Sequence, residues 1–204
     1  MGIIRSSFMI KIKQQLTRKN IFNGLWIAIL LVIVFVPAAK AMVIRGLIEV
    51  GLFNPAIETK NTAASEDLST IKFKDAKGKV ISLADLKGKV IFLNFWATWC
   101  PPCLAEMPSI NKFYEQFKDD GDVVFIMVDA DGDFSKSQAY MDRKKYKMPV
   151  YAFASDLPEK IFKGSLPTTV VFDKKGRISF QGEGAANYAS AKFIDFIKKL
   201  KTID

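Results

Sequence analysis

The stretch that decides the fold is NFWATWCPPC, residues 94–103. It contains the only two cysteines among 204 residues, separated by two prolines. The run VIFLNF that enters it, residues 90–95, is nearly all apolar, which is typical of a central strand covered on both faces. After a short turn a helix is expected to begin near Cys100, which places that sulfur at a helix N-terminus.

This position predicts a redox role for the cysteine pair. At a helix N-terminus, unpaired backbone N–H groups and the helix dipole favour the thiolate form. Pro101 and Pro102 suit the first turn, where a missing N–H costs least. Cys103 lies one turn further along and is expected to be shielded. Cys100 is therefore the predicted attacking sulfur, and Cys103 the sulfur that resolves a mixed disulfide.

A structural or a metal-binding role for the two cysteines is less well supported by the sequence. A structural disulfide across so short a loop stabilises by only about 2 kcal/mol on the chain-entropy model. The chain has no histidine, so a tetrahedral zinc site would lack most of its usual ligands. Covalent haem attachment would need histidine where Leu104 stands. Copper delivery or partner binding through the two sulfurs, without turnover, stays open as the alternative function.

The net charge of +9 does not indicate nucleic-acid binding. Residues 1–60 hold eight Lys or Arg against two Glu, whereas the remaining 144 residues hold 22 basic against 19 acidic side chains. The basic excess is therefore concentrated at the N-terminus and does not form a basic face on a folded module.

An uncharged run, IFNGLWIAILLVIVFVPAA at residues 21–39, predicts a transmembrane anchor. As a helix it would be about 28 Å long, close to the hydrocarbon thickness of a bilayer. Five basic residues precede it, so residues 1–20 are expected in the cytoplasm and the rest of the chain outside. A cleaved signal peptide is the alternative, because residues 39–41 have a small-x-small form. The length of both the apolar run and its basic flank favours the retained anchor.

Residues 40–70 are expected to form a juxtamembrane segment and linker. Residues 41–53, AMVIRGLIEVGLF, are expected to form either a short amphipathic helix on the outer leaflet or a continuation of the helix that spans the membrane. Arg45 and Glu49 would pair on it one turn apart. Residues 54–70 are polar and without apolar periodicity, so they are predicted to be a tether.

Residues 71–204 alternate strand and helix patterns. The predicted strands comprise an N-terminal hairpin with Val80–Leu83 after a turn at residues 75–78, Val90–Phe95, Val123–Val128, Val150–Phe153, and a hairpin of Thr168–Phe172 with Arg177–Phe180. Apolar residues at helical spacing predict helices from the cysteines to about Asp120, over Ser135–Lys145 and over Tyr188–Leu200. Such alternation predicts an α/β sandwich around a mixed sheet.

The longer pattern LKGKVIFLNFWATWCPPCLAEMP, residues 86–108, resembles the TlpA/ResA-like membrane-anchored thiol–disulfide oxidoreductases of the thioredoxin superfamily. The resemblance extends over roughly residues 71–200. It implies a bacterial, thioredoxin-like three-layer α/β/α domain on the periplasmic or outer face of the inner membrane. No metal or cofactor beyond a Cys100–Cys103 disulfide is implied, and the soluble domain is expected to be a monomer.

The resemblance also implies a direction of electron flow. Such proteins act as protein disulfide reductases, for example on apocytochrome c before haem attachment. An integral-membrane electron donor would then re-reduce the Cys100–Cys103 disulfide. An oxidising compartment favours disulfides, so a reductase there must be resupplied with electrons.

Substrate-binding residues follow from the same resemblance. GSLPTT, residues 164–169, matches the loop whose proline is cis and faces the disulfide. Pro167 is the predicted cis proline, and the backbone of Leu166 is expected to pair with an extended substrate segment. Trp99 is expected to cover the site beside Pro101 and Pro102.

Supporting residues are carried over in the same way. Glu106, one helical turn after Cys103, matches an acidic residue that relays a proton or raises the thiol pKa values. Asn94 stands where thioredoxin keeps a buried aspartate, which makes Glu106 the candidate internal base. Trp96 is expected to pack beneath the site.

Other motifs near the site are given structural interpretations. Pro108 is expected to kink the helix that carries the cysteines. Ala97 stands where thiol peroxidases need threonine. Asp129, Asp131 and Asp133 resemble the start of a calcium loop without its later ligands, so they are interpreted as a solvated loop and a helix cap.

Overall fold

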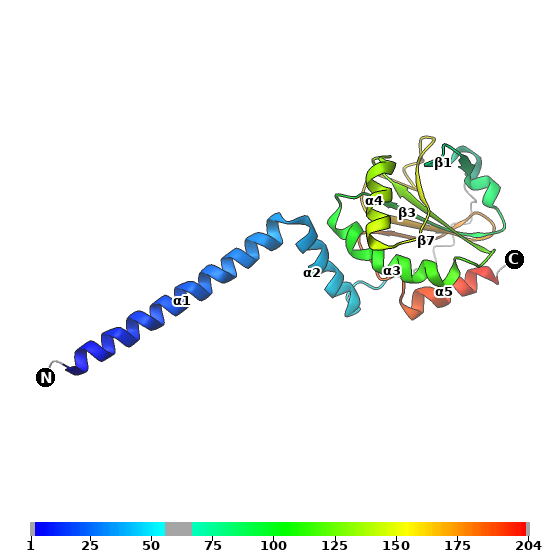
Figure 1. Ribbon diagram of the computed structural model, residues 1–204. Helices are drawn as coiled ribbons and strands as arrows, with labels where there is room; N and C mark the ends of the chain where they lie inside the picture. The colour runs from blue at the N-terminus through cyan, green and yellow to red at the C-terminus, as the bar shows by residue number, and fades with distance from the viewer. Residues whose placement is uncertain (1–2, 56–66, 203–204) are drawn as a thin grey trace. The chain divides into compact units, whose positions relative to one another are not determined.

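The computed structural model describes the backbone of residues 3–55 and 67–202, and side chains from residue 18 onward within those ranges (Figure 1). The chain divides into two compact units, Met1–Lys40 and Ala41–Asp204. The predicted tether lies largely at residues 56–66, outside the described residues.

The first unit is dominated by helix α1, Ile3–Phe35. Its segment Arg18–Phe35 is long and apolar enough to cross a membrane, with a mean hydropathy of 1.6. The helix ends at Phe35, and helix α2 starts at Pro37 and runs to Glu49. Proline disfavours helical geometry in the residue before it and suits a first helical position. Residues 41–49 therefore lie on a separate helix and do not continue α1.

The second unit is built on one mixed seven-stranded sheet with strand order β2-β1-β5-β4-β3-β6-β7. The strands are β1 (Lys72–Asp75), β2 (Val80–Ser82), β3 (Val90–Trp96), β4 (Val123–Asp129), β5 (Val150–Phe153), β6 (Thr168–Phe172) and β7 (Ile178–Glu183). β3 lies inside the sheet, parallel to β4 and antiparallel to β6. Both predicted hairpins, β1–β2 and β6–β7, are present.

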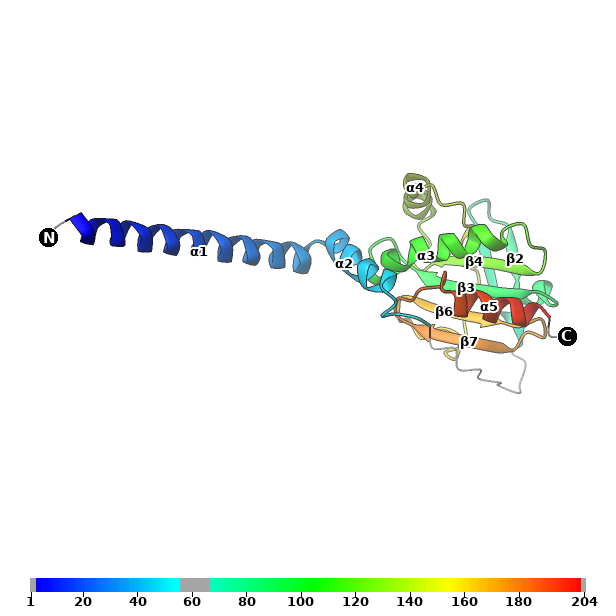
Figure 2. The ribbon, with the colours of Figure 1, turned by 90° about the horizontal axis from the view of Figure 1, so that it is seen from below.

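The two faces of β3 support two apolar clusters. Helices α3 (Pro101–Phe117) and α5 (Ala191–Lys201) cover one face, as Figure 2 shows. Phe92 projects into this cluster and contacts the rings of Phe113 and Phe193 at centroid distances of 5.2 and 6.2 Å. The opposite cluster is closed by 3₁₀ turns η1 (Leu68–Thr70) and η2 (Leu83–Leu86) and by the loop around Ile161.

Several element boundaries differ from the sequence prediction; β7, for example, ends at Glu183 and not at Phe180. Three of the differences show their physical cause. The folded unit includes Leu68, which is buried in the second cluster although it belongs to the predicted tether. Helix α5 begins at Ala191 behind the cap Ser190, whereas Tyr188 is buried in the preceding loop. Helix α4 runs over Phe134–Lys144 with Asp133 as its N-cap, one residue before the predicted start. These shifts arise because capping and tertiary burial set the ends of elements.

Candidate functional site

The cysteine pair forms a disulfide at the start of α3, with Cα atoms 5.3 Å apart. Cys100 is the N-cap of the helix, and its Sγ accepts a hydrogen bond from the Cys103 backbone N–H at 3.3 Å. Pro101 and Pro102 occupy the first helical positions, where they remove no needed donor. Cys100 is 3% exposed and Cys103 is fully buried, so only the first of the two residues contacts solvent.

Glu106 lies on α3 one helical turn after Cys103, and its carboxyl group is fully buried. Asn94, on β3, donates through Nδ2 to Glu106 Oε1 at 2.9 Å and to Thr169 Oγ1, on β6, at 2.8 Å. The backbone N–H of Ala186 donates to Glu106 Oε2 at 3.2 Å. Two segments distant from each other in sequence, β3 and the loop at Ala186, therefore hold this carboxyl group in place, and β6 holds Asn94 through Thr169.

Burial raises the pKa of Glu106 to about 8, and the hydrogen bonds from Asn94 and Ala186 offset only part of this rise. The group is therefore mostly protonated at neutral pH. Since Glu106 follows Cys103 by one helical turn, the two side chains share a helix face. This pKa lies close to the ordinary pKa of a thiol, about 8.5.

The loop between β7 and α5 is attached to the same region of α3. Ser109 Oγ accepts a hydrogen bond from the Tyr188 backbone N–H at 3.2 Å and donates to the Ala186 carbonyl at 3.2 Å. Burial raises the pKa of the Tyr188 phenol well above its usual value.

Two residues around Glu106 were not predicted as site residues from the sequence. Ala186 could not be predicted, because it contributes a backbone N–H, which every residue type except proline has. Thr169 had one signal, a polar residue in a buried strand.

The Leu166–Pro167 peptide bond is cis, as the resemblance implies. Pro167 is buried, and its carbonyl accepts a hydrogen bond from Gly184 N–H at 2.8 Å. Leu166 is half-buried and packs against both apolar clusters. Among the described residues, no hydrogen bond to the Leu166 backbone is present. Its peptide groups are thus available to an extended partner segment.

The outer side of the site is formed by Trp99, which is 61% exposed. Its Nε1 donates to Asp131 Oδ2 at 2.6 Å, and the Asp131 N–H donates to Asp129 Oδ1 at 3.2 Å. The interpretation of the three aspartates as solvated is wrong for Asp129, which is buried and whose pKa burial raises. Only Asp133 is a helix cap as predicted. Asp131 is a site residue that sequence reasoning missed.

The remaining predicted residues take structural positions. Trp96 is fully buried in the cluster that contains both cysteines. Helix α3 continues through Pro108 to Phe117 as one element. Within residues 3–55 and 67–202, no group of three or more His, Cys, Asp or Glu side chains is arranged to hold a metal ion.

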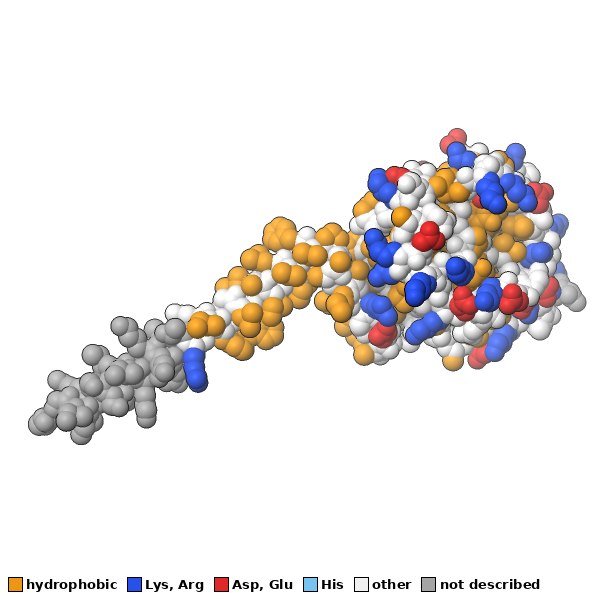
Figure 3. Space-filling model, in the orientation of Figure 1, with side chains coloured by type: hydrophobic (Ala, Val, Ile, Leu, Met, Phe, Trp, Pro, Cys, Tyr) orange, Lys and Arg blue, Asp and Glu red, His pale blue; other side chains and the backbone are white. Residues whose placement is uncertain are grey.

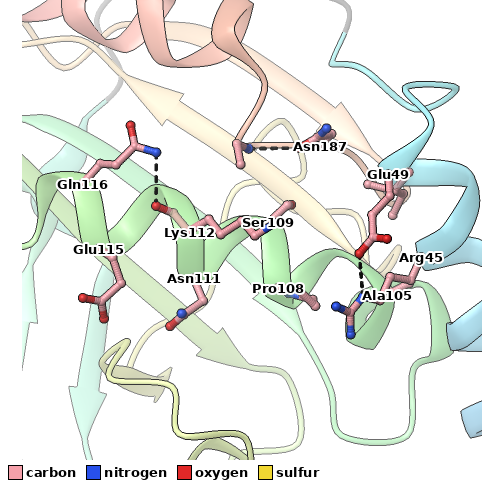
Figure 4. A pocket seen from close by; sticks show the side chains of 12 residues that line it. Arg45, Glu49, Ala105, Pro108, Ser109, Asn111, Lys112, Glu115, Gln116 and Asn187 are labelled. Carbon is pink, nitrogen blue, oxygen red and sulfur yellow. Dashed lines mark hydrogen bonds and ion pairs between the residues drawn. The ribbon is translucent and has the colours of Figure 1, made fainter.

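An open groove of about 500 Å³ runs between α2 and α3 (Figure 4). Arg45 and Glu49, paired at 3.0 Å, contribute to its α2 side, and Ala105 and Pro108 contribute to its α3 side. The groove therefore lies beside the helix that begins with the cysteines.

Comparison with known proteins identifies the protein family to which the sequence is similar. The sequence matches the redoxin family over residues 60–192. A protein named thiol-disulfide oxidoreductase ResA from Bacillus thuringiensis is 43% identical over 108 residues, 51% of this chain. The match spans 60% of that relative's length.

Two further similarities cover larger shares of the matching proteins. The ResA of Halalkalibacterium halodurans is 32% identical over 137 residues, 66% of this chain and 77% of the relative. A solved thioredoxin-family thiol:disulfide interchange protein from Chlorobium tepidum TLS is 27% identical, with a TM-score of 0.52. That similarity covers 68% of this chain and 99% of the solved one.

Proposed function

The chain belongs to the redoxin family and, within it, to the ResA-like thiol–disulfide oxidoreductases, and we propose that it is a membrane-tethered reductase of protein disulfides. In this proposal residues 1–20 are cytoplasmic and residues 21–39 form the anchor. Residues 40–70 connect the anchor to a catalytic domain, residues 71–204, on the outer face of the membrane.

The proposed reaction transfers two electrons from the reduced enzyme to a substrate disulfide. The Cys100 thiolate attacks one substrate sulfur, forms a mixed disulfide and releases the other substrate sulfur as a thiol. Cys103 then loses its proton and attacks Cys100 Sγ. This step forms the Cys100–Cys103 disulfide and releases the second substrate thiol. The helix N-terminus stabilises the first thiolate.

The single observation that carries the proposal is the buried, hydrogen-bonded carboxyl group of Glu106. Cys103 is enclosed, so water is a poor acceptor for its proton. Ionised Glu106 would accept that proton, and protonated Glu106 would return one when the disulfide is reduced again. A purely structural disulfide needs no such neighbour.

Substrate recognition is proposed for the surface around Cys100. An extended substrate segment would pair with the free backbone groups of Leu166 beside cis Pro167. Trp99, Pro101 and Pro102 would supply apolar contact around the attacked sulfur. Protein disulfides are the substrate class, with apocytochrome c as one example.

The apolar helix α1 supports the proposed location, because it is long enough to span a bilayer. We propose an integral-membrane electron donor as the source of electrons, since each turnover leaves the enzyme oxidised. The catalytic domain is proposed to act as a monomer.

The test of the function is a trapping experiment with the full chain in native membranes. A Cys103→Ser variant cannot resolve the mixed disulfide, so its substrates should remain linked to Cys100 and be identifiable by mass spectrometry. A Cys100→Ser variant is the matched control and should trap nothing. Equal recovery of partners from both variants, or none from Cys103→Ser, would contradict the exchange mechanism.

The direction of electron flow is tested by the reduction potential. Values range from about −270 mV for thioredoxin to about −120 mV for a strong oxidant, and a reductase should lie nearer the first. A value near the second would make the protein an oxidase. Stoichiometric copper binding without disulfide reduction would favour the alternative function as a delivery module.

A further inference from the structure

Helix α2 and the residues after it carry a concentration of exposed apolar side chains. Within the described part of Ala41–Asp204, the large hydrophobic residues that are exposed are Met42, Val43, Leu47, Val50, Leu52, Phe53, Val80 and Trp99. Six of these eight lie within residues 42–53. Trp99 belongs to the active site, and the face of the folded unit seen in Figure 3 mixes charged and apolar side chains. Apolar side chains gathered in this way mark a contact surface.

Helix α2 has two apolar faces, and only one of them is covered. Ile48 is 2% exposed and lines the groove with Ala105 and Pro108 of α3. Just beyond the helix, the Phe53 carbonyl accepts a hydrogen bond from Asn187 N–H at 2.8 Å, and Pro55 is buried. One side of this segment is thus attached to the folded unit.

The other side of the helix is uncovered. Val43 and Leu47 lie one turn apart on α2, Met42 adjoins Val43, and Val50 follows the last residue of the helix. We call these four residues the open α2 face. Met42 is 77% exposed and Val50 is 73% exposed. Val43 and Leu47 are 45% and 38% exposed, so the four side chains leave an apolar surface on the outside of the folded unit.

We propose that the open α2 face lies in the boundary between lipid headgroups and acyl chains of the outer leaflet. Met42 follows the end of the apolar segment Arg18–Phe35 by seven residues. The proposed anchor, residues 21–39, includes most of that segment. If the segment spans the bilayer, Met42 can be no more than about 25 Å from its end, even with an extended chain. Amphipathic helices rest in this boundary with their apolar side turned towards the acyl chains. Because the chain links α2 directly to the span, lipid is the partner expected to contact the open α2 face.

The consequence concerns the active site. Helix α2 lines a groove together with α3, the helix that begins at the disulfide. Cys103 precedes the groove residue Pro108 by five residues, about 7.5 Å along the axis of α3. Lipid contact through the open α2 face would hold the cysteines near the membrane surface. A membrane-bound electron donor would then meet a restricted set of orientations and a raised effective concentration of the disulfide.

The test is photolabelling of the full chain reconstituted in phosphatidylcholine–phosphatidylglycerol vesicles that contain a diazirine lipid. Labels mapped by mass spectrometry should fall on residues 42–50 as well as on the span. A Val43→Glu, Leu47→Glu double variant should lower labelling of α2 at least tenfold and leave the span labelled, because charge is excluded from the acyl region. Val80→Glu, which places one such charge at an exposed apolar position outside α2, should leave the labelling of α2 unchanged.

The outcomes separate this inference from the membrane tether itself. A labelled span with an unlabelled α2 overturns the inference and leaves the tether standing. An unlabelled span and α2 overturn both. Protection of α2 from hydrogen exchange without lipid labels would assign the face to a protein or a second copy and overturn the lipid occupant. The folding of the double variant is checked with a soluble disulfide substrate. If the variant reduces it as fast as the wild type does, its domain is folded.

Discussion

The two sides of the disulfide differ in how their acidic residues are used. On the inner side, Glu106 is buried and fixed by Asn94 on β3 and the backbone of Ala186. On the outer side, Asp131 accepts the indole N–H of an exposed tryptophan, Trp99. Each carboxyl group has a hydrogen-bond donor, but only the inner one is removed from water.

This difference teaches that burial, more than charge type, sets the chemistry of a carboxyl group here. An enclosed carboxyl group retains its proton to higher pH, and its pKa then approaches that of a thiol. The exposed carboxyl group of Asp131 orients the Trp99 side chain through a hydrogen bond. We therefore expect the inner side to control proton transfer and the outer side to control contact with substrate.

The largest expected effect is on the pH dependence of stability. The pKa of Glu106 is about 8 in the folded chain, against a reference value of 4.5. Between these values the folded state binds more protons than the unfolded state, so the free energy of unfolding falls as pH rises. The total loss is roughly 4 kcal/mol. Urea unfolding from pH 4.5 to 8, in wild type and Glu106→Gln, measures it.

Glu106→Gln should remove most of the fall in the free energy of unfolding between pH 4.5 and 8, because glutamine does not titrate. Glu115→Gln, at an exposed position of the same helix, is the control and should retain it. Equal slopes in wild type and Glu106→Gln would show that the inner carboxyl group is not held in its neutral form.

A second effect of Glu106→Gln should appear in turnover. General base catalysis contributes about 10²–10⁴-fold, so we expect resolution of the mixed disulfide to slow by about 100-fold at pH 7. The rate should also lose its rise towards pH 8. Stopped-flow kinetics with a small disulfide substrate measures this, and Cys103→Ser defines complete loss. A variant within threefold of wild type would remove Glu106 from the proton transfer.

Asn94→Leu should act through Glu106 and have a smaller effect. It removes the hydrogen bond to Oε1, so the free energy of unfolding should fall by about 1–2 kcal/mol. Because that hydrogen bond lowers the pKa of Glu106, its loss should move the pH midpoint of turnover upward. Thr169→Val keeps the Asn94–Glu106 contact and should shift the midpoint less. A downward shift in Asn94→Leu would contradict the positioning role.

Trp99→Phe should have the smallest effect. It removes the indole N–H that Asp131 accepts, at an exposed site, and should cost no more than about 1 kcal/mol of stability. We expect KM to rise a few-fold with kcat nearly unchanged, since the ring covers the site without moving protons. Asp131→Asn keeps an acceptor and should be milder. A loss of kcat as large as that of Glu106→Gln would erase the distinction between the two sides.

Much of the framework was predictable from local sequence. The apolar run into Phe95, followed by Cys100 and two prolines, predicted a strand and a helix start that the structure confirms. Hairpin turns were visible as clusters of Asp, Lys and Gly. The start of α5 was predicted three residues early, because the apolar side chain of Tyr188 continues the helical pattern although it is buried in a loop.

The environment of the carboxyl groups was less predictable. Asp129 and Asp131 are two residues apart and look alike in sequence, yet the first is buried at the end of β4 and the second reaches Trp99. Similarly, a glutamate one turn after a cysteine is compatible with a solvated helix surface. Nothing within that turn indicates that the loop at Ala186 closes over it.

The sequence by itself determined the cysteine pair, its place at a helix N-terminus, the absence of histidine and the apolar helix near the N-terminus. These depend on residue types and on spacings within one or two turns. Only the tertiary structure decided that the Glu106 carboxyl group is shielded from water and hydrogen-bonded by Asn94 and Ala186. It also decided that one face of α2 is covered and the other exposed. The physical reason is that desolvation depends on segments as much as 80 residues apart meeting in space, which no local pattern records.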